Sequence, residues 1–140
     1  MNNININTQR IASVARRHHL QLVVLYGSYA RGTQRHESDI DIAALGATPL
    51  SFETLLSLHN EFSDAFPSKE VDIQSLHRAA PFFRYQVMKD GVLLFGDPHL
   101  FTRLKVYAIR AHQENFKLRH MRDVLLQRRQ RHLESLFIHA

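Results

Sequence analysis

The sequence predicts an α/β fold, with a small mixed sheet, helices packed against it and a long C-terminal helix. Two observations predict the sheet and its helices: short apolar or alternating segments typical of strands, and stretches of helical period between them. A third predicts the C-terminal helix, because the helical pattern runs from Pro98 to near the end, although its apolar steps break at Glu114. The chain has 140 residues, 44% of them apolar, which is enough for one ordinary domain with a core.

Four segments are predicted as strands. Residues 20–26 (LQLVVLY) form a continuous apolar run ended by Gly27, which is typical of a buried strand. Residues 39–45 and 70–76 alternate acidic or polar residues with aliphatic ones, as strands with one buried face do. Residues 92–95 form a fourth, shorter strand.

Three shorter helices are predicted, one before the first strand and two between later strands. The first covers about 8–19, capped by Asn7 or by the residue after it. The second follows Ser51 and extends to about Phe66. The third covers 81–90 and begins with a proline, whose missing N–H costs nothing in a first helical turn.

The charge of the chain is unevenly distributed. Residues 1–96 carry nine Lys and Arg against nine Asp and Glu, whereas residues 97–140 carry nine against four, so the net charge of +5 lies in the C-terminal segment. We therefore predict a core over 1–96 and a basic helical extension over 97–140. A basic helix indicates either an anionic partner or a solvated surface, and charge alone leaves both open.

An apolar seam runs along the predicted C-terminal helix at three- and four-residue steps. We expect its first half to pack on the sheet and its second half to face a partner. The seam consists of Leu104, Tyr107, Ala111, Leu118, Met121 and Leu125.

Several classes of protein are disfavoured by the composition. There is no apolar run near the ~18 residues that span a membrane, and the first ten residues lack the pattern of a signal peptide. The chain has no cysteine, which excludes disulfides and thiolate metal sites. A cytoplasmic protein without a membrane segment fits these features.

Asp39, Asp41 and Asp72 are the candidate metal ligands and catalytic residues. Residues two apart in a strand point to the same face, so Asp39 and Asp41 project together while Ile40 and Ile42 enter the core. Two carboxylates this close repel each other unless they are protonated or share a cation. Oxygen ligands suit a hard ion, either Mg²⁺ or Mn²⁺, and a third carboxylate from a neighbouring strand is typical of two-metal phosphoryl transfer.

The pair Gly27-Ser28 ends the first buried strand, and ten residues separate Ser28 from Asp39. The glycine allows a sharp turn, and Ser28 then begins a short helix whose N-terminus favours phosphate. Arg31, one turn later, carries a cation able to neutralise triphosphate charge. Gly27, Ser28 and Arg31 are thus the predicted nucleotide-binding residues.

The combined motif, Gly27-Ser28 followed by Asp39-Ile40-Asp41, resembles the signature of the polymerase-β-like nucleotidyltransferase superfamily. The order of predicted elements over about residues 8–96 is also similar to its minimal core. A short chain of this kind with an added helix most resembles the minimal nucleotidyltransferase (MNT) antitoxins of HEPN/MNT toxin–antitoxin pairs.

This resemblance implies an Mg²⁺-dependent enzyme with two ions, held by Asp39, Asp41 and Asp72, and with ATP as substrate. It implies transfer of AMP to a tyrosine of a cognate HEPN toxin, with which the chain forms a hetero-oligomer. Two alternatives stay open: transfer to a tRNA 3′ end or a small-molecule hydroxyl, and a non-catalytic toxin-binding module. A nucleic-acid partner is the less favoured of the possible partners.

Overall fold

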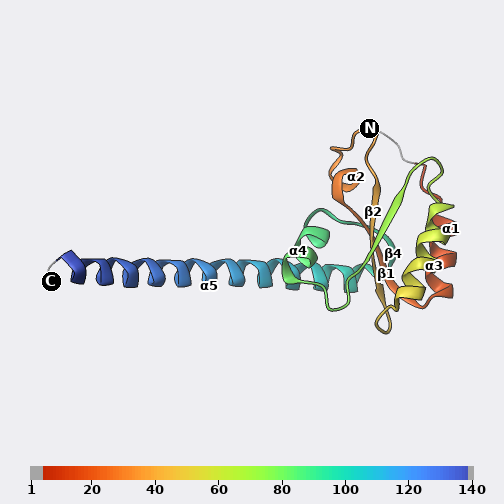
Figure 1. Ribbon diagram of the computed structural model, residues 1–140. Coiled ribbons are helices and arrows are strands. Elements are labelled where there is room, and N and C mark those ends of the chain that lie inside the picture. The colour runs from red at the N-terminus through yellow and green to blue at the C-terminus, as the bar shows by residue number, and fades with distance from the viewer. Residues whose placement is uncertain (1–4, 139–140) are drawn as a thin grey trace.

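The computed structural model describes residues 5–138 and shows a four-stranded sheet with helices on both faces (Figure 1). A long C-terminal helix leaves this body and extends far beyond it (Figure 1). The predicted fold class is confirmed. The elements are, in chain order, α1 (Thr8–Arg17), β1 (Leu20–Tyr26), α2 (Gly27–Arg31), β2 (Ile40–Gly46), α3 (Phe52–Ser63), β3 (Val71–Ser75), α4 (Pro81–Asp90), β4 (Val92–Gly96) and α5 (Pro98–Ile138).

The sheet is mixed, with strand order β3-β2-β1-β4. Strand β1 pairs antiparallel with both β2 and β4, whereas β2 and β3 are parallel. A parallel pair needs a crossover connection, and α3 is the helix of that crossover. The arrangement leaves β3 at an edge and starts β2 and β3 at the same end of the sheet.

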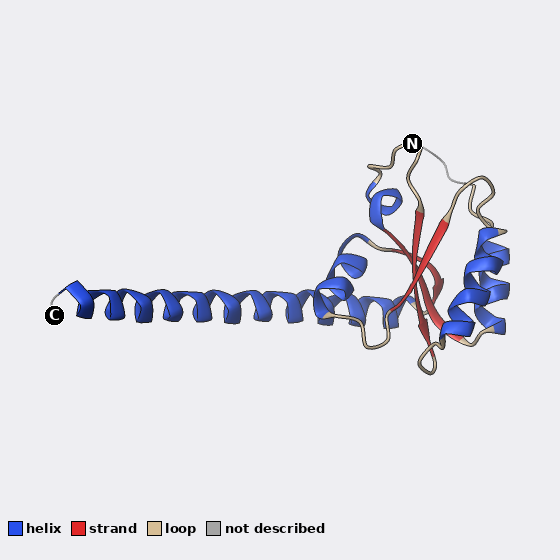
Figure 2. Ribbon diagram, in the orientation of Figure 1, coloured by secondary structure: helices blue, strands red, loops and turns tan. Residues whose placement is uncertain are grey.

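Helices cover both faces of the sheet (Figure 2). Helices α1 and α3 pack on one face, where Ile11, Phe62 and Ile42 are fully buried. Helix α4 and the first turns of α5 pack on the other, where Val24, Val87 and Ala108 belong to one buried cluster. Strands β1, β2 and β4 supply residues to both clusters because their side chains alternate between the two faces.

Two helices end earlier than the sequence predicts. Helix α1 ends at Arg17, because His19 adopts a left-handed backbone with φ of 53° that no helix continues. Helix α3 ends at Ser63 rather than at Phe66, although the Phe66 side chain remains buried in the core. The polypeptide leaves the helical path there through a turn in which the Phe66 N–H donates to the carbonyl of Ser63 at 3.3 Å.

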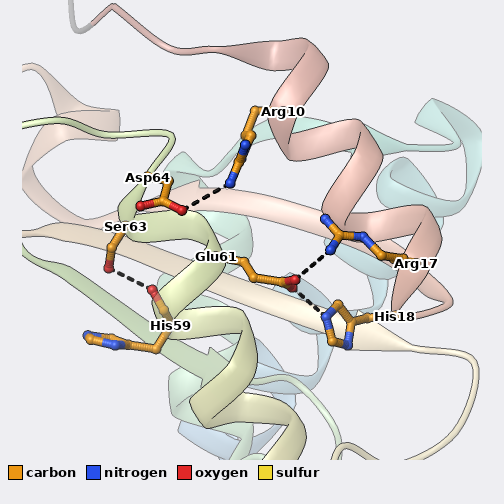
Figure 3. A network of polar contacts seen from close by, with 7 residues as sticks. All are labelled: Arg10, Arg17, His18, His59, Glu61, Ser63 and Asp64. Carbon is orange, nitrogen blue, oxygen red and sulfur yellow. Dashed lines mark hydrogen bonds and ion pairs between the residues drawn. The ribbon is translucent and has the colours of Figure 1, made fainter.

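Polar contacts join α1 to α3 on the outer surface of the body (Figure 3). Glu61 of α3 accepts from Arg17 Nη1 at 2.7 Å and contacts His18 Nε2 at 2.5 Å. A more exposed pair, Arg10 with Asp64, lies one turn away at 2.9 Å. These contacts fix the crossover helix against α1 and thereby the position of β3.

We expect Glu61→Gln to lower the free energy of unfolding by about 1 kcal/mol, because one half-buried carboxylate serves two partners. Urea unfolding followed by circular dichroism measures this change. The matched substitution Asp64→Asn breaks the exposed pair and should cost less than about 0.5 kcal/mol. Equal losses in the two variants would contradict the special role of Glu61.

The first turns of α5 belong to the body, and the rest of the helix does not. Ala108 is buried, and the His112 ring stacks on Tyr85 of α4 with centroids 3.8 Å apart. Tyr107, which the predicted seam placed among the packing residues, is 63% exposed. The reason is the helical period of 3.6 residues, which turns Ala108 to the body in place of its neighbour.

No helix formed by residues 5–138 is long and apolar enough to cross a membrane. The boundary between a core over 1–96 and an extension over 97–140 stays a prediction.

Candidate active site

The turn between β1 and α2 lies directly against the aspartates. Gly27 has φ of 74°, a conformation that favours glycine. A Cβ atom at this position would collide with the Asp41 carboxylate. The glycine therefore has two roles: it reverses the chain after β1, and it leaves room for the carboxylate.

Ser28 and Arg31 follow this turn in α2. No side chain caps the N-terminus of α2, so none competes with a ligand for its first N–H groups. Ser28 is half-buried in the first turn, and Arg31 is exposed at the other end. The helix stops at once because Gly32 adopts the left-handed conformation and Thr33 N–H donates to the Ser28 carbonyl at 3.0 Å.

The parallel register of β2 and β3 brings two of the predicted carboxylates together. Asp41 is paired directly with Asp72, and Asp39 precedes Ile40, the first residue of β2. Ile40 is fully buried, as the alternating pattern predicted. The aspartates thus point to the face of the sheet that carries α4 and α5, at the end where β2 and β3 begin.

The electrostatics of the site centre on Asp41. Its burial raises the pKa of this carboxyl above the usual range, and the Asp72 and Asp39 carboxylates raise it further. The Arg31 guanidinium lowers the pKa of Asp41, which supports a position of this cation close to the site. The ionised form of Asp41 is consequently disfavoured until another positive charge arrives.

Tyr26, the last residue of β1, closes the inner side of the site. It is paired with Asp41 across the sheet, and its ring meets Phe83 of α4 edge to face at 5.7 Å. Burial raises the pKa of Tyr26, and the Asp41 and Asp72 carboxylates raise it further. Its hydroxyl therefore stays neutral beside the aspartates, and its ring separates them from α4.

The donor set fits Mg²⁺, which prefers carboxylate oxygens and commonly completes its shell with substrate phosphates. Burial is the largest cause of the raised pKa of Asp41, and the Asp72 and Asp39 carboxylates add to it. A bound cation would favour the ionised form of this carboxyl. Among residues 5–138, no three His, Asp or Glu side chains are close enough to hold a metal ion by themselves. Oxygens of a bound nucleotide would therefore have to complete the coordination.

Two residues near the site were not predicted from the sequence. Lys69 Nζ donates to the carbonyl of His36 at 2.6 Å and lies 5.8 Å from the centre of the Tyr29 ring. It thus joins α2 to the segment that leads to Asp39. Gln74, two residues after Asp72 in β3, donates to the Asp72 carboxylate from Nε2 at 3.4 Å. The only sequence signal for Gln74 is this two-residue spacing, which places both side chains on one face of the strand.

We expect Gly27→Ala to abolish activity and to lower stability by about 1–3 kcal/mol, because it adds both a strained backbone and a collision. Thermal unfolding and a nucleotide-transfer assay measure the two effects. Gly32→Ala is the matched control, since its φ of 71° is similar but nothing lies within 4 Å of the new Cβ. If the two variants behave alike, backbone strain and not contact with Asp41 explains the requirement for glycine.

Comparison with known proteins finds relatives of this chain. The chain is 40% identical over 86 residues to the protein adenylyltransferase MntA of Shewanella oneidensis, over 59% of this chain and 61% of that protein. The match therefore spans less than two thirds of that relative.

Solved structures resemble the chain over more of its length. A crystal structure described as a toxin–antitoxin with AMP-PNP aligns with 86% of this chain and 99% of its own, with 31% identity and a TM-score of 0.71. The complex of tri-AMPylated Shewanella oneidensis HEPN toxin with MNT antitoxin aligns with 85% of this chain and 96% of its own, with 28% identity and a TM-score of 0.65.

One family model covers the part of the chain that forms the site. It is described as polymerase beta, nucleotidyltransferase, and it matches residues 9–99, which is more than half of the chain. The matched region contains the Gly27-Ser28 turn and all three aspartates. The chain therefore belongs to the polymerase beta nucleotidyltransferase family.

Proposed function

We propose that this protein is an adenylyltransferase that moves AMP from ATP to a tyrosine hydroxyl of a cognate HEPN toxin and thereby neutralises it. The observation that carries the proposal is the register of β2 and β3, which sets Asp41 beside Asp72 against the Gly27 turn. The name of the Shewanella relative supports the reaction, and the AMPylated toxin in the solved complex supports the acceptor.

The residues have separate tasks in this reaction. Ser28 and the first N–H groups of α2 would bind the terminal phosphates of ATP, and Arg31 would balance their charge. Asp39 and Asp41, with Asp72, would hold two Mg²⁺ ions, which neutralise the charge that develops on the phosphates. Tyr26 would keep water away from the inner side of the site.

The transfer needs only ATP and the acceptor hydroxyl as reactants. The acceptor oxygen attacks the α-phosphorus in line and forms a phosphodiester, while the bond from that phosphorus to the oxygen of the β-phosphate breaks and pyrophosphate leaves. Asp72 is exposed to solvent on the edge strand β3, so it is accessible to the hydroxyl of an approaching acceptor. It would accept that proton as a general base.

We expect Asp72→Ala to lower the turnover by at least about 100-fold and to change ATP affinity much less, because Asp72 serves the acceptor side. Calorimetric titration of a non-hydrolysable ATP analogue with Mg²⁺ gives the affinity, and single-turnover transfer gives the rate. An affinity loss as large as that of Asp41→Ala would instead place Asp72 on the nucleotide side.

A second acceptor class is favoured by one observation, the net positive charge of residues 97–140. Such a helix could bind RNA, and the acceptor would then be the 3′ hydroxyl of a tRNA. The two are separated by incubating the full chain with labelled ATP and Mg²⁺, and then with purified HEPN toxin or with tRNA. We expect label in the toxin, at tyrosine, and none in the tRNA. Labelled tRNA with unlabelled toxin would reject the proposed function.

A further inference from the structure

A cavity of about 190 Å³ lies on the same face of the sheet as the aspartates, beneath α4 and α5. Its walls are mainly apolar, from Leu45 of β2, Leu76 just after β3, Met88 of α4 and Leu104 of α5. A protein cavity of about 150 Å³ already accepts a benzene ring. The volume therefore suits one large apolar side chain.

The cavity is connected to the active site by the strands themselves. Asp41 and Leu45 lie on one face of β2, and Asp72 and Leu76 occupy the matching positions on the adjacent chain segment, where Leu76 N–H donates to the Ala44 carbonyl at 2.9 Å. Four residues of a strand span about 13 Å. A surface of two strands thus leads from the paired carboxylates to the cavity.

One wall of the cavity carries an uncompensated positive charge. Arg84 of α4 is half-buried there, and no acidic side chain among residues 5–138 forms an ion pair with it. The other basic group, His77, is engaged with the Gly46 carbonyl through Nε2 at 3.0 Å. The cavity therefore favours an apolar group that has a carboxylate next to it.

The exposed wall is formed by Tyr107 of α5, which is 63% exposed. A large aromatic side chain at the mouth of an apolar cavity is a typical contact for a protein partner. In its exposed position it contributes little to the core.

We infer, on the basis of the proposed transfer to a protein tyrosine, that this cavity recognises the acceptor protein. It would hold one apolar side chain of the toxin, with an acidic neighbour paired to Arg84. The bound side chain would fix the acceptor segment so that its tyrosine reaches Asp72, about 13 Å away. Arg84 and Tyr107 are then specificity residues for the acceptor and take no part in the chemistry.

The first test is kinetic and uses the full chain with the HEPN toxin as acceptor. We expect Arg84→Glu and Tyr107→Ala to raise the KM for toxin by about 10-fold or more, with kcat and the KM for ATP within about two-fold of the unchanged protein. Arg110→Glu is the matched control, because it makes the same charge change on an exposed position of α5. If Arg84→Glu and Arg110→Glu have the same effect, general charge explains the result and the inference is wrong.

The second test measures binding without any transfer. The probe is acetyl-Asp-Phe-amide, added to methyl-labelled full-length protein and followed by NMR at Met88 and Leu104. We expect saturable shifts that weaken about 10-fold in Arg84→Glu or with acetyl-Asn-Phe-amide. Absence of shifts at these methyl groups overturns the inference.

The outcomes separate this inference from the proposed function. If both variants transfer AMP to the toxin with an unchanged KM, the cavity does not recognise the acceptor, but the proposed adenylyltransferase function stands. No transfer to toxin by the unchanged protein rejects the proposed function, and with it the acceptor role of the cavity. Shifts that are equal for the two probes reject the role of Arg84.

Discussion

Asp41→Asn is expected to reduce nucleotide transfer by at least about 1,000-fold while leaving the fold intact, and Asp39→Asn should do the same. Both substitutions keep the shape of the side chain and remove an anionic oxygen ligand, on which charge stabilisation at the phosphates depends. Single-turnover transfer from labelled ATP at saturating Mg²⁺ measures the loss. Near-normal turnover in either variant would show that the two-metal assignment is wrong.

Asp41→Asn should also change the stability of the protein, in a direction that a defect in folding would not produce. Because burial and the neighbouring carboxylates disfavour the ionised form of Asp41, its neutral replacement should slightly raise the melting temperature of the protein without metal. Added Mg²⁺ should stabilise the unchanged protein more than the variant. Glu53→Gln, an exposed carboxylate at the start of α3, is the matched control. It should not raise the melting temperature, because an acid in a first helical turn is stabilising, and it should leave the effect of Mg²⁺ unchanged.

Truncation after Gln113 is expected to leave a folded core that binds ATP with Mg²⁺ but binds the toxin at least about 100-fold more weakly. The cut retains the contact of His112 with Tyr85 and removes the part of α5 that extends beyond the body (Figure 1). The helix has 41 residues, which corresponds to about 60 Å. The large apolar side chains exposed on its distal part are Phe116, Leu118, Met121, Leu125, Leu126, Leu133, Leu136, Phe137 and Ile138.

These exposed apolar side chains are not buried against any other element of the body that residues 5–138 form, and an apolar surface of this kind indicates a protein partner. The adjacent arginines would steer an acidic surface and add specificity. Co-purification with the HEPN toxin in moderate salt measures the effect. A truncated chain that retains the toxin at full strength would refute the docking role of the helix, and an insoluble one would show that the helix belongs to the core.

A substitution in the full chain tests the same surface without removing it. Leu125→Asp should weaken toxin binding by about 10-fold or more, because the side chain is 60% exposed and its position is in the apolar stripe. Gln127→Asp places the same charge on the opposite side of the helix and should have little effect. Equal losses from the two variants would point to charge and not to the stripe.

The sequence alone was sufficient for the fold class and the order of the elements. Alternation in the second and third strands predicted which residues enter the core, and Ile40 and Ile42 are fully buried. The pattern worked because strand and helix periods are local properties of the backbone. The spacing from Gly27-Ser28 to Asp39 and Asp41 also identified the family that the comparisons show.

Only the tertiary structure decided how these residues meet. Strand pairing is a contact between distant segments, so no local pattern could state that Asp41 lies opposite Asp72 in register. The same holds for Lys69, whose contact with His36 spans 33 positions, and for Arg84, which the packing of α4 and α5 places at a cavity. Helix period predicted a seam on α5, but the rotation of that helix against the body decided that Ala108 is buried and Tyr107 exposed, because burial depends on what a face packs against and not on its own sequence.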